Sequence, residues 1–234
     1  MENNASKFQL RPYAAVIFAG FLLLVLVWGI WQAAQKKQQE ANPPGVAKKT
    51  QSSQPVATST SAAFNPDAGK LLAPISKALE RVTKKPFGLK VSPHSSPVSP
   101  ERFSGYHTGV DFETFADEQD AEVPVFAVCD GALVEKRFAS GYGGVAVQSC
   151  RLDNQDITVV YGHLQLVSIS AKAGSALTAG EQLGILGKGF GPETDGERKH
   201  LHLGIHMGKT VNLAGYVKTP AELSGWLNIL KYLK

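Results

Sequence analysis

Two neighbouring stretches near the N-terminus each lack one kind of side chain. Residues 13–31 contain no charged side chain. In a helix these 19 residues would rise about 28 Å, close to the roughly 30 Å hydrocarbon core of a bilayer. We therefore expect a single transmembrane signal anchor at 13–31, and the flanking charges do not choose its orientation. A cleaved signal peptide is the alternative, but its apolar core is normally shorter, and Ala33 and Ala34 offer a poor cleavage site.

Residues 32–64 have almost no large apolar side chains and are rich in Gln, Ala, Ser, Thr, Pro and Lys. Such a composition cannot bury enough surface to fold, so this stretch is predicted to be a flexible linker. A coil of this length has an end-to-end distance of about 30 Å. That reach would let a following domain search the space near the membrane.

The region after the linker lacks the basic excess that the whole chain shows. The chain has a formal net charge of +4, and residues 1–100 hold 12 Lys and Arg against 4 Asp and Glu. Residues 101–215 hold 9 basic against 15 acidic residues. Because the predicted folded part is acidic, the composition argues against nucleic acid as a partner.

Cysteine is scarce, with two residues in 234. Cys129 and Cys150 lie 11 and 10 positions from Ser140, near the turn of an apparent hairpin, where equidistant residues face each other. A disulfide is chemically allowed if the domain is exported to an oxidising space. Two small buried thiols in adjacent strands are the open alternative. Neither is expected to bind zinc.

Histidine and aspartate are more informative. His107 and Asp111 are four residues apart, and His200 and His202 alternate with Leu201 and Leu203. In an extended strand alternate side chains share a face, so the two imidazoles project together. Imidazole and carboxylate suit Zn²⁺, and three protein ligands leave a fourth position for water. Spacing alone does not separate His200 from His202, and an ordinary strand with exposed histidines also fits it.

Six motifs surround these residues in a fixed order. They are His-Thr-Gly-Val-Asp-Phe (107–112), Val-Phe-Ala-Val-Cys-Asp-Gly-Ala-Leu-Val (125–134), Gly-Tyr-Gly-Gly-Val-Ala-Val (141–147), Val-Tyr-Gly-His-Leu (160–164), Leu-Gly-Ile-Leu-Gly (183–187) and His-Leu-His (200–202). The set closely resembles the lysostaphin/LytM-type zinc metalloendopeptidases over roughly residues 86–215. The resemblance implies a mainly β domain, an antiparallel sheet or sandwich.

The same resemblance assigns roles. It makes His107, Asp111 and His202 the ligands of Zn²⁺, and it makes His163 and His200 the catalytic pair that activates water and stabilises the oxyanion. It implies an endopeptidase that hydrolyses peptidoglycan cross-links or stem peptides. Such an enzyme must face the cell wall, so we expect a single-pass membrane protein with a short cytoplasmic N-terminus at 1–12 and an extracytoplasmic catalytic domain. A catalytically inactive relative that activates other wall hydrolases is the alternative, and the sequence identifies no regulatory protein partner.

Two loops depart from the family pattern. Residues 116–122 form a longer acidic loop, and residues 195–199 replace the usual small residues before the last motif. We expect both loops to border the substrate groove; for the acidic loop, a solvated loop without substrate contact is the open alternative. Residues 65–90 are predicted to be a helical entry segment, residues 91–215 the catalytic domain and residues 216–234 a short C-terminal helix. Both helices are predicted from apolar residues at helical spacing. These are Leu71, Ile75, Leu79 and Val82 in the first segment, and Leu223, Trp226, Leu227, Leu230 and Leu233 in the second.

Overall fold

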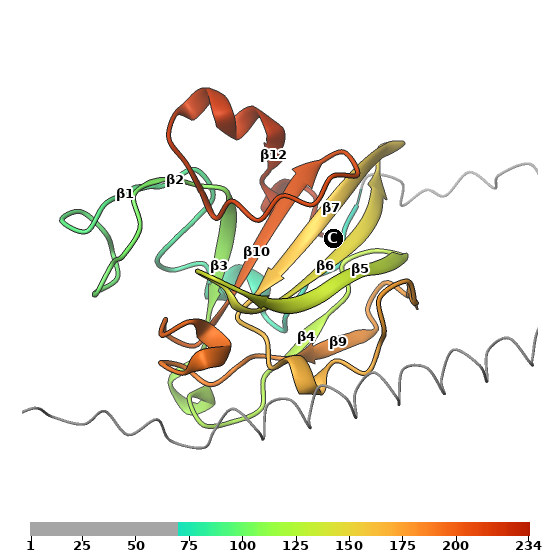
Figure 1. The fold of residues 1–234 in the computed structure, drawn as a ribbon, viewed down its shortest axis with the longest axis horizontal. Coiled ribbons are helices and arrows are strands. Elements are labelled where there is room, and N and C mark those ends of the chain that lie inside the picture. The colour runs from blue at the N-terminus through green and yellow to red at the C-terminus, as the bar shows by residue number, and fades with distance from the viewer. Residues whose placement is uncertain (1–69) are drawn as a thin grey trace, which may run out of the picture. The chain divides into compact units, whose positions relative to one another are not determined.

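A computed structural model describes residues 70–234, which fold mainly into antiparallel β-strands (Figure 1). The largest sheet has seven strands in the order β12-β10-β7-β6-β5-β8, and β3 also pairs with β10. Its strands are β3 (Gly109–Glu113), β5 (Gly131–Ala139), β6 (Gly143–Leu152), β7 (Gln155–Gly162), β8 (Ala176–Leu177), β10 (His200–Met207) and β12 (Trp226–Leu227). The predicted mainly β, antiparallel class is therefore confirmed.

Two smaller sheets complete the fold. One contains β1 (Lys90–Val91), β2 (Gly105–His107) and β11 (Tyr216–Val217), in the order β1-β2-β11. The other pairs β4 (Pro124–Phe126) with β9 (Gln182–Ile185). Short 3₁₀ helices cover Ala116–Glu118, Leu166–Ser168 and Pro192–Thr194.

Strand β10 organises the large sheet because it has partners on both edges. Along one edge it pairs with β7. Along the other, residues 200–204 pair with β3 and residues 205–206 pair with β12. Leu201, Leu203 and Ile205 are buried in the main core, so the alternate residues His200 and His202 face the opposite side of the sheet. A one-residue slip would exchange the two sets, which makes the register strongly specified.

The predicted helical entry segment is wrong over most of its described length. The only α-helix there is α2 (Ala78–Arg81), and Leu79 within it is 71% exposed. Leu71 instead bridges in parallel to Leu233, and its backbone N–H donates to the carbonyl of Tyr232 at 2.8 Å. Pro74 has no backbone N–H and would interrupt a helix, so this segment is extended although its apolar residues have helical spacing.

The predicted C-terminal helix is also wrong in type and extent. Residues 216–234 contain 3₁₀ helices at Pro220–Gly225 and Ile229–Lys231, with β12 between them. Trp226 and Leu227 pair with His206 and Ile205, because the edge of β10 beyond β3 offers unpaired backbone groups. The Asn228 side chain then accepts from the N–H of Leu230 and starts a separate turn. The apolar residues are used in packing, but on a chain that is not α-helical.

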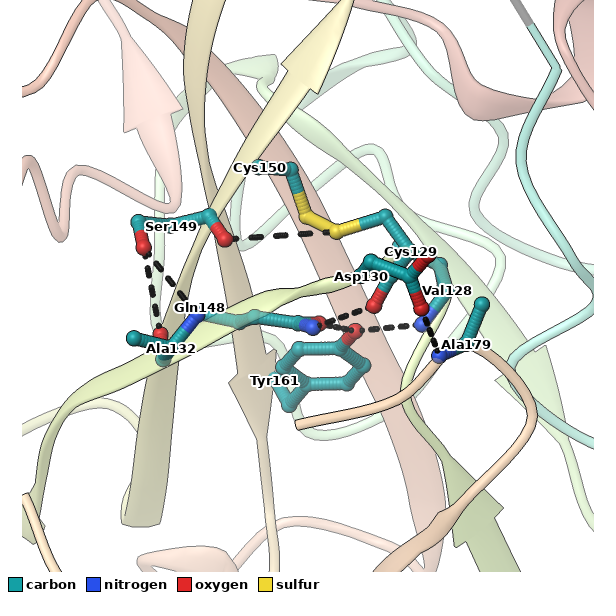
Figure 2. Close-up of a disulfide and its surroundings, with 9 residues drawn as sticks. All are labelled: Val128, Cys129, Asp130, Ala132, Gln148, Ser149, Cys150, Tyr161 and Ala179. Atoms are coloured by element: carbon teal, nitrogen blue, oxygen red, sulfur yellow. Dashed lines mark hydrogen bonds between the residues drawn. A yellow bond between two sulfur atoms is a disulfide. The ribbon is translucent and has the colours of Figure 1, made fainter. Parts of the chain in front are cut away.

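Cys129 and Cys150 form a disulfide, which resolves the alternative left open by the sequence (Figure 2). Beside it lies a buried polar cluster on the core face of β6 and β7. The Tyr161 hydroxyl donates to Gln148 Oε1 at 2.6 Å and accepts from the N–H of Val128 at 3.0 Å. Gln148 Nε2 donates to the carbonyl of Cys129 at 2.7 Å. These hydrogen bonds connect the loop before β5, which contains Val128 and Cys129, to the large sheet.

Within residues 70–234 there is no helix with the length and apolar character to cross a membrane. The predicted segments at 1–12, 13–31 and 32–64, and the start of the 65–90 segment, lie outside the described residues.

Candidate metal centre

His107, Asp111 and His202 come together from three strands. Asp111 on β3 pairs directly with His202 on β10, and His107 ends the neighbouring strand β2. Gly109 allows the close approach of β3 to the His202 ring. A Cβ at that position would lie 2.8 Å from the imidazole and 2.6 Å from the carbonyl oxygen of Leu203. The glycine of the His-Thr-Gly-Val-Asp motif is thus required by the packing of the site itself.

The facing atoms of these three residues have the spacing of a metal site. His107 Nε2 lies 3.0 Å from His202 Nδ1 and 3.3 Å from Asp111 Oδ1, and His202 Nδ1 lies 3.1 Å from Asp111 Oδ1. Zinc bonds of 2.0–2.1 Å in a tetrahedron place neighbouring ligand atoms about 3.3 Å apart. Within residues 70–234, these three side chains are the one group of at least three His, Cys, Asp or Glu side chains with this arrangement.

The protonation of the group also fits a metal. His107 Nδ1 lies 3.2 Å from the carbonyl oxygen of Pro86, so it donates there and leaves the Nε2 lone pair facing the centre. Burial lowers the pKa of His202 to about 4, which keeps its imidazole neutral near pH 7. Burial alone would raise the pKa of Asp111, but the neighbouring His200 and His107 outweigh it and hold that pKa well below its usual range. Imidazole and carboxylate ligands suit Zn²⁺.

His163 and His200 lie beside this group. Their ring centroids are 4.3 Å apart, and His200 Nε2 is 3.2 Å from Asp111 Oδ2. His200 Nδ1 donates to the carbonyl of Arg198 at 2.8 Å. His163 follows β7 with a left-handed φ of 65°, and its Nδ1 is buried without a hydrogen-bond partner. Burial is the main cause that lowers the pKa of His163 well below its ordinary value.

The structure therefore brings all five predicted site residues together. Asp111, His163, His200 and His202 line a cavity of about 310 Å³. His206, on the same face of β10, stays apart from the group and packs edge-on against Trp226 at 4.9 Å between ring centroids. Spacing alone did not separate His200 from His202, and only the family resemblance assigned them different roles; the register places them differently. His202 stands opposite Asp111, while His200 stands opposite Glu113, nearer the strand end.

Several cavity residues were missed in the sequence. The Tyr142 hydroxyl lies 3.4 Å from His202 Nε2, and burial raises the pKa of that hydroxyl. On the other side, the buried Lys85 ammonium lies 2.6 Å from Glu101 and 3.0 Å from the Tyr216 hydroxyl. Tyr142 lies within the Gly-Tyr-Gly motif, so the sequence contained a signal that could have identified it as a cavity residue. The Lys85 cluster joins three separate segments and has no local pattern.

The two unusual loops have different positions. Glu197 and Arg198 line the cavity, as expected for residues 195–199, whereas none of residues 116–122 does. Glu118 is instead paired with Arg81 at 2.6 Å. The Lys199 ammonium donates to the backbone carbonyls of Glu118, Gln119 and Ala121 at 2.9, 3.3 and 2.5 Å. The longer loop and the lysine thus form one structural unit outside the cavity.

Residues 105–213 match the family model described as Peptidase family M23. This part of the chain is similar to peptidase family M23. The match contains all five site residues, and the resemblance to lysostaphin/LytM-type proteins is confirmed. No curated protein matches the chain.

Solved structures that match part of the chain at low sequence identity include the following three. Csd3 of Helicobacter pylori is 21% identical, with 65% of this chain and 36% of that chain covered and a TM-score of 0.40. The catalytic domain of the antimicrobial peptidase lysostaphin from Staphylococcus simulans is 20% identical, with 64% and 86% covered and a TM-score of 0.41. A zinc containing peptidase from Vibrio cholerae is 21% identical, with 59% and 37% covered and a TM-score of 0.39. This chain therefore spans little more than a third of the Csd3 and Vibrio cholerae structures.

Proposed function

We propose that this protein is a membrane-anchored zinc-dependent endopeptidase that hydrolyses peptide bonds in peptidoglycan cross-links or stem peptides. The observation that carries the proposal is the gathering of His107 Nε2, Asp111 Oδ1 and His202 Nδ1 at 3.0–3.3 Å inside the part of the chain that matches family M23. In this proposal these three residues hold Zn²⁺. When bound, the ion would lower the pKa of a water molecule and polarise the scissile carbonyl.

His200 is proposed as the residue that moves the proton. Its Nδ1 hydrogen is committed to the carbonyl of Arg198, so Nε2 is the ring atom that can accept a proton. Asp111 Oδ2, 3.2 Å from Nε2, would stabilise the positive charge that the imidazole then carries. The same Nε2 can later return the proton to the leaving amine, and no covalent acyl-enzyme is needed.

His163 is proposed as the residue that stabilises the oxyanion. Its Nδ1 is buried without a partner, and its ring lies beside that of His200. Leaving a buried polar atom unpaired costs about 1–3 kcal/mol, so the molecule keeps this arrangement at a loss of stability. A substrate oxygen that arrives at the cavity would supply the missing partner, and the hydrogen bond would be strongest when that oxygen carries charge.

The proposed substrate follows from the family. The lysostaphin/LytM-type resemblance, which the M23 match supports, implies peptidoglycan peptides. The proposed location combines two observations. The charge-free stretch 13–31 would anchor the chain, and the disulfide between Cys129 and Cys150 suits an oxidising space outside the cytoplasm. Counting thiols in denatured, unreduced protein taken from its native cells tests the location. No free thiols are expected, and two free thiols would contradict export.

The activity is tested by digesting purified peptidoglycan fragments with the full-length chain. Cross-linked and uncross-linked muropeptides should be offered separately, with and without added zinc, and the products identified by mass spectrometry. We expect a zinc-dependent cut at a peptide bond and none at a glycosidic bond. The His200→Gln variant is the matched control, because it removes the proton carrier and leaves the three proposed ligands. Protein that binds zinc but cuts no fragment would overturn the enzymatic proposal and favour the inactive, activating relative.

A further inference from the structure

Arg198 joins two carboxylates on the site face of β3. Its Nε donates to Glu113 Oε2 at 2.8 Å, and its Nη2 donates both to Glu113 and to Asp111 Oδ2, the latter at 2.9 Å. Asp111 and Glu113 are two residues apart on one strand, so their side chains project side by side. The guanidinium therefore bridges a proposed metal ligand and the next acid on the same face. Its side chain is 13% exposed.

The arrangement gives the two oxygens of Asp111 different neighbours. Oδ1 faces His107 and His202, at 3.3 and 3.1 Å. Oδ2 faces Arg198 and His200, at 2.9 and 3.2 Å. A carboxylate can give a metal one oxygen or both. With Oδ2 committed to Arg198, Asp111 would offer a bound metal Oδ1 alone, which would leave a fourth position for water beside the three protein ligands.

Glu113 is a second carboxylate held by the same guanidinium. It pairs with His200 of β10 and lies two residues from Asp111 on the same face of β3. Arg198 holds it through Nε and Nη2, and Lys84 adds a longer ion pair at 3.5 Å. Without the guanidinium, two like charges would face each other and Glu113 would be released from its main anchor. A released glutamate is a competing ligand for the open position.

We propose that Arg198 is a positioning residue that keeps Asp111 a one-oxygen ligand and keeps Glu113 out of the metal's coordination. The inference rests on the metal site of the proposed function and goes beyond its assigned residues. Lysine would replace arginine only in part. The planar guanidinium donates to Glu113 and Asp111 at the same time, whereas a single ammonium group lacks this fixed arrangement of donors. Hydrogen-bond partners of metal ligands typically contribute 10–100-fold to metal affinity.

The test compares the full-length chain with its Arg198→Met, Arg198→Lys and Arg102→Met variants. Zinc affinity is measured by competition with a chromophoric chelator, without substrate. The visible absorption of bound Co²⁺ then reports coordination number, because the band weakens when a fifth ligand joins. Arg102 is the matched control. It pairs with Asp195 and Glu197 in the adjoining loop, at 3.2 and 3.1 Å, and has no hydrogen bond or ion pair with Asp111.

We expect Arg198→Met to show a weakened Co²⁺ band and a zinc affinity that differs from the wild type by about 10–100-fold. Arg198→Lys should lie between the two in both measurements, which also covers the case that the methionine variant does not fold. Arg102→Met should match the wild type in both measurements. Wild-type affinity and an unchanged Co²⁺ spectrum in both Arg198 variants would overturn the inference alone. A wild-type protein that binds zinc without cutting peptide would overturn the proposed function alone, and one that binds no zinc would overturn both.

Discussion

Two buried polar clusters lie on opposite faces of the same sheet, and they differ in how fully their hydrogen bonds are made. On the core face, the Tyr161 hydroxyl and both groups of the Gln148 amide have partners (Figure 2). On the other face, His163 Nδ1 and Arg198 Nη1 are buried without any. Native proteins leave few buried polar atoms unpaired, so each exception needs a reason. The first cluster is complete as a structural element, whereas the second lacks partners that a ligand would supply.

The largest expected effect is on the incomplete cluster. His107→Ala removes one of the three proposed ligands, so bound zinc should be lost and hydrolysis should fall by roughly 10⁴-fold. Metal analysis of the purified variant and its activity on muropeptides check this. His206→Ala is the matched control, because His206 lies on the same strand face as His202 but packs against Trp226. Full zinc in the His107→Ala protein would reject the ligand set.

The next effect separates chemistry from metal binding within that cluster. His163→Gln and His200→Gln should keep bound zinc and slow turnover by about 10²–10⁴, the usual range for lost acid–base help. Zinc content and the turnover rate are measured on the same samples. Loss of zinc together with activity in the His200 variant would mean that His200 is itself a ligand.

A mutation in the fully hydrogen-bonded cluster of Tyr161 and Gln148 should lower the stability of the protein rather than its activity. Tyr161→Phe leaves Gln148 Oε1 and the N–H of Val128 without their partner in the core, at a cost of about 1–3 kcal/mol in the free energy of unfolding. Urea unfolding measures this cost, and zinc content and turnover should stay unchanged in the folded variant. A variant of unchanged stability but reduced turnover would show that this cluster also serves the reaction.

The last effect is on the pH dependence of the metal-free protein. Burial lowers the pKa of His202 to about 4 and that of His163 well below its ordinary value. The unfolded chain therefore binds more protons than the folded one below about pH 6.5. Stability should fall as the pH drops from about 6.5 to about 4, by at most about 1.4 kcal/mol per pH unit for each group.

Urea unfolding at pH 7.5 and at pH 5 compares the metal-free wild type with His163→Gln. The variant should lose less stability on acidification, because one of the two groups is gone. Equal stability of the wild type at both pH values would mean that these imidazoles accept protons freely in the folded state. Tyr161 and Gln148 carry no charge in this range, so Tyr161→Phe should keep the wild-type pH dependence.

Local patterns predicted the strands well and the ends of the described region poorly. Alternation of Leu201 and Leu203 with two histidines correctly predicted strand β10, because one buried face forces a period of two. Helical spacing around Ile75 and Trp226 predicted helices that do not form. Both segments pair through their backbones with distant parts of the chain, Leu71 with Leu233 and Trp226 with His206. Such pairing depends on which strand edges are available, and local spacing does not contain that information.

The sequence by itself determined the β class, the family and the five residues around the candidate metal centre. These follow from short motifs whose residue types and spacing need little context. Only the tertiary structure decided that Cys129 and Cys150 are joined, that Lys85 lies beside Glu101 and Tyr216, and that Arg198 bridges Asp111 to Glu113. Each of these contacts joins residues from different segments. Strand register and side-chain direction set the contacts, and both are fixed only when the whole sheet has formed.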